Sequence, residues 1–164
     1  MITLVLGGAR SGKSAVAEGL ARRLPGPVTY AATASVDPAD GDHAARVDAH
    51  KARRDAAWST VEAGTELAGV LRASTGTVLV DSLGTWVTAH ADLEVDVGSL
   101  CSALVERAGD TVIVSEEVGL GVHPSSEAGR RFRDVLGSVN VAVADVAGEV
   151  LLVVAGRTLP LGRP

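Results

Sequence analysis

A glycine-rich loop directly follows a short apolar segment near the N-terminus and limits the folds that this chain can adopt. The loop matches the pattern G-x-x-x-x-G-K-[ST] at every fixed position with Gly7, Gly8, Ala9, Arg10, Ser11, Gly12, Lys13 and Ser14. Residues 2–6 are apolar enough for a buried strand, and a helix is predicted over about residues 14–24. Such a loop lets backbone N–H groups surround a phosphate, and the helix N-terminus adds a favourable dipole. The loop therefore predicts a phosphate-binding site, and a chance glycine-rich turn is the weaker interpretation.

The rest of the chain alternates between apolar runs and helical patterns. Further strands are predicted at residues 28–31, 58–61, 78–80, 111–114 and 150–154. Helices are predicted at residues 43–56, 65–73, 99–108 and 127–143, and residues 82–86 are a possible helix start. Hydrophobic residues make up 46% of the chain but aromatic residues only 2%, so the core must consist of Val, Leu and Ala. The pattern predicts one α/β domain over residues 1–164, with the P-loop NTPase (RecA-like) layered fold and a mostly parallel central sheet flanked by helices.

Three side chains are candidates for the chemistry at this loop. Lys13 is expected to reach the β- and γ-phosphates of a nucleotide, and the Ser14 hydroxyl to ligate Mg²⁺. Asp81 ends the predicted strand at residues 78–80, where a carboxylate can bind the metal directly or through water. The alternative role for Asp81 is a helix cap, and its position favours the metal.

Two classes of protein carry such a loop: a small-molecule transferase and a nucleotide-dependent switch. Residues 81–84 spell D-x-x-G, as switches do, but no N-K-x-D base-recognition motif occurs in the chain. A basic cluster supports the transferase instead, because Arg46, His50 and Arg53 or Arg54 share one face of the predicted helix, next to Lys51. An imidazole among arginines suits attack on phosphorus, although a solvated basic face is the commoner role for such a run.

The overall charge and the cysteine content exclude several partners. The net charge of −5 opposes binding of nucleic acid through bulk charge. The single cysteine, Cys101, permits no internal disulfide, and the longest apolar runs are strand-sized. The N-terminus has no signal-peptide pattern. We therefore expect a cytoplasmic protein with no membrane partner.

Several further segments, in order along nearly the whole chain, resemble one known family. Residues 30–34 (YAATA), 46–54 (RVDAHKARR), 58–62 (WSTVE), 80–88 (VDSLGTWVT), 114–124 (VSEEVGLGVHP) and 152–156 (LVVAG) are similar to its conserved blocks. The phosphate loop also has the family's form. The family is the bifunctional adenosylcobinamide kinase / adenosylcobinamide-phosphate guanylyltransferase of cobalamin biosynthesis.

The resemblance implies two reactions on a corrinoid substrate. The first phosphorylates adenosylcobinamide with ATP or GTP, and the second transfers GMP from GTP to the resulting phosphate, giving adenosylcobinamide-GDP. The position that matches the family's guanylyl-carrying histidine is His50, so His50 and Lys13 are the implied catalytic residues. The other implied nucleotide contacts are Ala32, Thr33, Ala34, Lys51, Arg53, Arg54, Glu62 and Asp81. The resemblance also implies a homo-oligomer, a trimer.

The chain departs from the family pattern at three positions. Glu116 stands where Asn is usual, Ala89 also replaces a common Asn, and His123 replaces an apolar residue before Pro124. None of the three is expected to touch Lys13, His50 or Asp81. A kinase-only member of the family and a nucleotide-gated switch are the alternatives to the bifunctional enzyme.

Overall fold

A seven-stranded sheet forms the centre of the molecule. The computed structural model describes residues 1–34 and 55–163. The strands lie in the order β3-β2-β4-β5-β1-β6-β7. All neighbours are parallel except β6 and β7, which are antiparallel. Their bounds are β1 Ile2–Gly7, β2 Val28–Ala32, β3 Ser59–Glu62, β4 Thr77–Asp81, β5 Thr111–Glu116, β6 Glu149–Val154 and β7 Arg157–Pro160.

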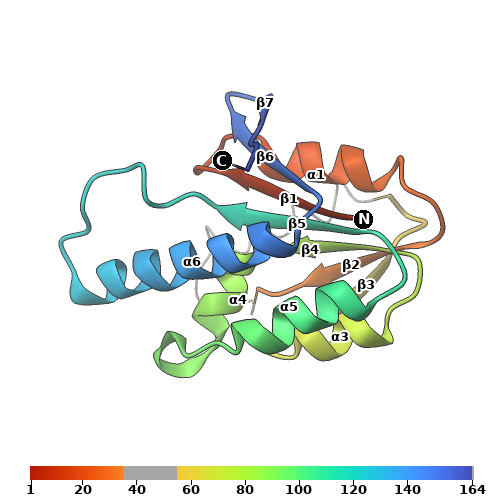
Figure 1. Cartoon of the computed structure of the whole chain (residues 1–164), viewed down its shortest axis with the longest axis horizontal. Coiled ribbons are helices and arrows are strands. Elements are labelled where there is room, and N and C mark those ends of the chain that lie inside the picture. The colour runs from red at the N-terminus through yellow and green to blue at the C-terminus, as the bar shows by residue number, and fades with distance from the viewer. Residues whose placement is uncertain (35–54, 164) are drawn as a thin grey trace.

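The described helices are divided unequally between the two faces of this sheet. Figure 1 shows α1 on one face and α3, α4, α5 and α6 on the other. Their bounds are α1 Lys13–Ala21, α3 Leu67–Ala73, α4 Leu83–Ala89, α5 Val97–Glu106 and α6 Glu127–Val146, with a short 3₁₀ turn at Ala91–Leu93. Because successive strand residues point to opposite faces, β1 contributes Leu4 to the core under the four helices and Val5 to the core under α1. The predicted layered α/β fold with a mostly parallel sheet is confirmed.

Most predicted elements are present, with shifts at their ends. The first helix ends at Ala21, three residues earlier than predicted, and α6 continues to Val146. The possible helix start near residue 82 is a helix whose cap is Ser82, not Asp81, because the Ser82 hydroxyl accepts a hydrogen bond from the Thr85 N–H. The predicted helix 43–56 lies almost wholly outside the described residues, and at its end Asp55 and Ala56 are not helical.

The strands predicted from the sequence do not include β7, the one antiparallel strand in the described sheet. Its residues are all exposed, so it lacks the apolar run that identifies a buried strand. The turn between β6 and β7 has Ala155 and Gly156 at positive φ, and it doubles the chain back beside the phosphate loop.

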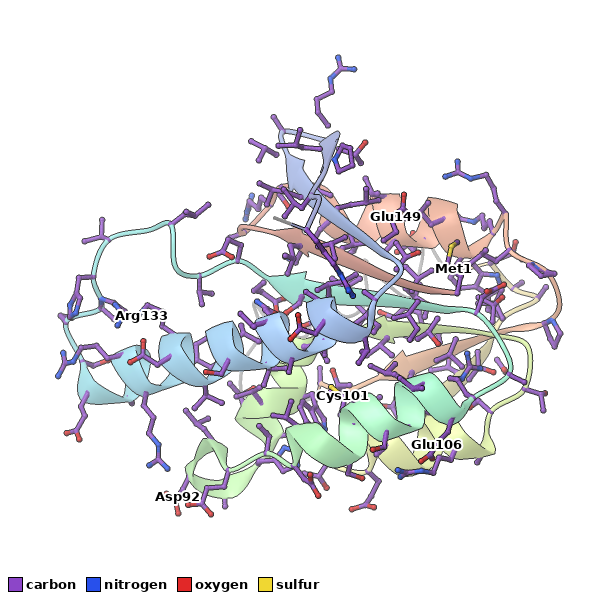
Figure 2. All side chains as sticks on the ribbon, in the orientation of Figure 1. Met1, Asp92, Cys101, Glu106, Arg133 and Glu149 are labelled. Atoms are coloured by element: carbon purple, nitrogen blue, oxygen red, sulfur yellow. The ribbon has the colours of Figure 1, made fainter. Side chains whose placement is uncertain are left out.

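Cys101 on α5 faces α6, where its thiol lies 3.6 Å from the carbonyl oxygen of Ala142 (Figure 2). Burial raises the pKa of this thiol, and the nearby Asp145 carboxylate adds to the effect. The cysteine is therefore a packing residue between α5 and α6.

Candidate active site

The phosphate loop joins the carboxyl end of β1 to α1, and two of its residues have positive φ. Gly12 has φ +93° and Arg10 φ +57°, both in the left-handed region. A Cβ on Gly7 would lie 2.8 Å from the Val153 carbonyl oxygen of β6. Gly12 is also the N-cap of α1 and supplies no side-chain acceptor, so N–H groups of the first turn can donate to the oxygens of a ligand instead. The loop has the conformation and the helix that phosphate binding requires.

The β6–β7 turn supports this loop from outside the motif. The Gly156 N–H donates to the Ser11 carbonyl at 2.8 Å, and a Cβ on Gly12 would lie 3.3 Å from Gly156 Cα. The backbone of the turn therefore packs directly against the loop. The sequence motif gives no sign of this contact, which depends on the missed hairpin.

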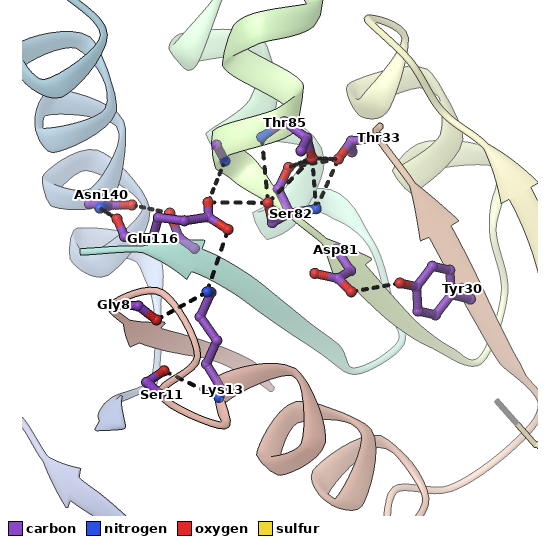
Figure 3. A network of polar contacts seen from close by, with 12 residues as sticks. Gly8, Ser11, Lys13, Tyr30, Thr33, Asp81, Ser82, Thr85, Glu116 and Asn140 are labelled. Atoms are coloured by element: carbon purple, nitrogen blue, oxygen red, sulfur yellow. Dashed lines mark hydrogen bonds and ion pairs between the residues drawn. The ribbon is translucent and has the colours of Figure 1, made fainter. Parts of the chain in front are cut away.

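Lys13 extends from the start of α1 toward the carboxyl end of β5 (Figure 3). Its ammonium nitrogen lies 3.4 Å from the Gly8 carbonyl oxygen and 3.7 Å from Oε1 of Glu116. The Lys13 side chain is only 13% exposed. Both contacts are longer than the 2.7–2.9 Å typical of charge-assisted hydrogen bonds, so the ammonium is held loosely.

The position of Glu116 beside Lys13 contradicts the expectation that none of the three departures from the family pattern touches this lysine. It ends β5 and is paired in register with Gly7 at the start of the loop. Its Oε2 accepts hydrogen bonds from the Ser82 hydroxyl at 3.1 Å and from the Gly84 N–H at 3.0 Å. That expectation is wrong because residues 13 and 116 are far apart in the chain and meet only through the pairing of β1 with β5.

The D-x-x-G segment has a packing role in this arrangement. A Cβ on Gly84 would come within 2.1 Å of Glu116 Oε2, so only glycine leaves room for the carboxylate. Around the same junction, the Thr33 hydroxyl lies 2.6 Å from that of Thr85, donates to the Ser82 carbonyl at 2.7 Å and accepts from the Ser82 N–H at 2.9 Å. Thr33 is fully buried. These contacts hold the start of α4 against the ends of β2 and β5.

Asp81 ends β4, as predicted, one strand beyond Glu116. Its Oδ2 accepts a hydrogen bond from the Tyr30 hydroxyl at 2.6 Å, across the pairing of β4 with β2. Tyr30 is 2% exposed, so this bond holds the carboxylate from the core side. Tyr30 is not among the predicted site residues, although it closely precedes the predicted contacts at residues 32–34.

The remaining predicted contacts divide into two groups. Ala32, Thr33, Ala34 and Glu62 lie at the carboxyl ends of β2 and β3, where Ala32 pairs with Glu62. This is the same edge of the sheet as the phosphate loop. The second group lies outside the described residues: His50, Lys51, Arg53 and Arg54. The contacts of both groups with nucleotide stay predictions.

The oxygen donors at this edge suit Mg²⁺, which keeps several waters and takes one or two protein oxygens together with phosphates. Ser14 offers a hydroxyl at the start of α1 and Asp81 a carboxylate at the end of β4. Within residues 1–34 and 55–163, no group of three His, Cys, Asp or Glu side chains forms a metal site by itself. The residues thus fit a metal that arrives with the nucleotide.

Among the described helices, none is long and apolar enough to cross a membrane.

The fold and the loop define a P-loop nucleotide-binding protein. In agreement, the chain superposes on the flagellar accessory protein FlaH of Methanocaldococcus jannaschii with a TM-score of 0.52 and 15% identity, covering 96% of this chain and 74% of that one. A type III secretion system ATPase gives a TM-score of 0.57 with 13% identity, covering 92% of this chain and 50% of the other. At these identities the likeness concerns the fold alone, and it confirms the predicted fold class.

The sequence comparisons identify the family. The family model for cobinamide kinase / cobinamide phosphate guanyltransferase matches residues 3–161, and the chain belongs to this family. It is 40% identical to the bifunctional adenosylcobalamin biosynthesis protein CobP of Pseudomonas aeruginosa, across all of this chain and 99% of that protein. It is 34% identical to CobU of Escherichia coli, across 95% of this chain and 97% of that protein. The predicted family is confirmed, and with it the kinase and guanylyltransferase function in cobalamin biosynthesis.

Proposed function

We propose that this chain carries out both reactions with nucleotides held by its phosphate loop, and that His50 carries GMP between GTP and the corrinoid. The family match over residues 3–161 is the observation that carries the proposal. The strained loop, the loosely held ammonium of Lys13 and the carboxylate of Asp81 at the same sheet edge support it. The acceptors are adenosylcobinamide and then its phosphate.

In the kinase reaction, the acceptor hydroxyl attacks the γ-phosphorus of ATP or GTP. A bond forms between the hydroxyl oxygen and phosphorus while the bond to the β–γ bridging oxygen breaks, and the nucleoside diphosphate leaves. The hydroxyl proton passes to solvent or to a carboxylate. Lys13 would stabilise the charge on the β- and γ-phosphate oxygens through this step. Backbone N–H groups of the loop would orient the same phosphates.

In the guanylyl transfer, an imidazole nitrogen of His50 attacks the α-phosphorus of GTP, and pyrophosphate leaves. A phosphate oxygen of adenosylcobinamide phosphate then attacks the same phosphorus. The P–N bond breaks, adenosylcobinamide-GDP forms, and neutral imidazole is restored. Neutral imidazole is a good nucleophile near pH 7, which suits a histidine for this transfer. Lys51, Arg53, Arg54 and Glu62 are the proposed nucleotide contacts around it.

Ser14 and Asp81 would hold Mg²⁺ together with the phosphates, and the ion would supply charge neutralisation there. The Tyr30 hydrogen bond orients the Asp81 carboxylate for this role. We further propose a cytoplasmic homo-oligomer, a trimer, as the resemblance implies.

The test is covalent labelling with GTP that carries a labelled α-phosphate, in the presence of Mg²⁺. Wild-type protein should acquire a label that is stable to alkali and labile to acid, as a histidine phosphoramidate is. His50→Ala should acquire none, whereas His43→Ala, which removes another histidine of the same region, should label like the wild type. Absence of label on wild-type protein that binds GTP would contradict the guanylyl-histidine and leave the kinase-only alternative. Equal labelling of His50→Ala and wild-type protein would show that a residue other than His50 carries GMP.

A further inference from the structure

The two carboxylate oxygens of Glu116 have different partners. Oε2 is fixed at the start of α4 by the Ser82 hydroxyl and the Gly84 N–H, at 3.1 and 3.0 Å. Oε1 lies 3.7 Å from the Lys13 ammonium (Figure 3). The backbone around the residue is also held, because the Glu116 carbonyl accepts from Asn140 at 3.1 Å and the Glu117 N–H donates to Gly7 at 3.1 Å. The carboxylate is therefore fixed beside the phosphate loop.

Nucleotide binding must change this arrangement on the lysine side. A P-loop lysine binds the β- and γ-phosphates, so the Lys13 ammonium must exchange Glu116 for phosphate oxygens. Glu116 cannot withdraw as easily, since its Oε2 and its backbone are bonded within the fold. The bound phosphates then lie close to a negative charge that is only 28% exposed and therefore weakly screened by solvent.

We propose that Glu116 is a specificity-determining residue that makes this nucleotide site select metal-loaded over metal-free nucleotides. The inference rests on the proposed function, in which the phosphate loop holds the nucleotide. A carboxylate repels a ligand in proportion to the charge of that ligand. Free ATP carries about four negative charges and ATP with Mg²⁺ about two, so the repulsion is roughly twice as large for the free nucleotide.

A purely structural role for Glu116 makes the opposite prediction. If the carboxylate only held Lys13 in place for phosphates, then its removal would weaken binding of both forms of the nucleotide. Selection by charge predicts that removal strengthens binding, and more so for the metal-free form. The sign of the change thus separates the two roles.

The experiment is titration calorimetry of the full chain with ATP, once with Mg²⁺ and once with a chelator. Glu116→Gln keeps the length of the side chain and an oxygen for Ser82 and Gly84, but removes the charge. We expect its Kd for metal-free ATP to fall about tenfold and its Kd for ATP with Mg²⁺ about threefold. Glu117→Gln is the matched control, because the next carboxylate in the chain accepts from the Gly119 N–H at 2.6 Å instead of facing Lys13. It should leave both values near those of the wild type.

The changes in Kd of the two variants test whether the charge of Glu116 selects metal-loaded nucleotide. Tighter binding that is larger without metal, and confined to Glu116→Gln, supports selection by charge. Weaker or unchanged binding of Glu116→Gln to metal-free ATP overturns it and leaves the proposed function intact. An equal gain in Glu117→Gln also overturns it, because the effect would then reflect overall charge. Wild-type protein that bound neither form would overturn the proposed function itself, and this inference with it.

Discussion

Two partly buried cations lie at opposite ends of the central strands, and their surroundings differ sharply. Lys13, at the carboxyl end, has one carbonyl contact at 3.4 Å and one ion pair at 3.7 Å. Arg107, at the amino end, donates to five oxygens of neighbouring segments, those of Leu71, Ser74, Gly76, Asp110 and Thr111. Burial lowers the pKa of the Arg107 guanidinium, and the Asp110 carboxylate opposes this shift.

The difference separates a cation that stabilises the fold from one that is available to a ligand. Arg107 joins the end of α3 to the starts of β4 and β5, and its donors are used within the chain. The described residues offer the Lys13 ammonium only long contacts, at 3.4 and 3.7 Å. A ligand can therefore improve the contacts of Lys13 at little cost, whereas at Arg107 it would have to replace short bonds.

The largest effect is expected at Lys13, on activity. Lys13→Ala should lower the rate of corrinoid phosphorylation about 10²–10³-fold, because it removes an electrostatic contact to the transferring phosphoryl group. Its unfolding free energy should change by less than about 1 kcal/mol, since a long ion pair contributes little. Steady-state kinetics and urea unfolding measure the two quantities. Arg72→Ala is the control, because it removes an exposed cation paired with Glu106 and should alter neither. A large loss of unfolding free energy in Lys13→Ala would show that Lys13, like Arg107, stabilises the fold.

The next effect is expected at Arg107, on stability. Arg107→Met should lower the unfolding free energy by about 2–4 kcal/mol, because partly buried carbonyl oxygens lose a charged donor. The nucleotide Kd of the folded variant should equal that of the wild type, since the site lies at the other end of the strands. Urea unfolding and calorimetry test this, with Arg72→Met as the exposed counterpart. Weakened nucleotide binding without loss of stability would remove the distinction between the two cations.

The smallest effect is expected at Thr111. Its hydroxyl accepts from Arg107 at 2.8 Å, and the residue is fully buried. Thr111→Val keeps the shape and leaves Arg107 its backbone acceptors, so we expect a loss of about 1 kcal/mol in unfolding free energy. The same urea titration applies. If Thr111→Val cost as much as Arg107→Met, the stabilisation would belong to this one hydrogen bond and not to the whole set.

Several parts of the molecule were predictable because their signals are local. Burial on both faces leaves apolar runs in β1, β4 and β5, and the phosphate loop is one continuous segment. The place of Asp81 at a strand end is also predictable, because the apolar run of β4 leads directly to it. In contrast, β7 is exposed throughout, and the role of Tyr30 depends on the pairing of β2 with β4. Neither feature leaves a periodic pattern in the sequence.

The class of protein, the phosphate loop and the family can be read from the sequence, since each depends on residue types at fixed spacing. Which carboxylate faces Lys13, and what holds it there, depends on the tertiary structure. In a parallel sheet the order of strands in space differs from their order in the chain, so β5 lies between β1 and β4. Glu116 therefore lies next to the loop while Asp81 lies one strand further away. The charge balance of the site follows from that order, because electrostatic interaction depends on distance in space and not on separation along the chain.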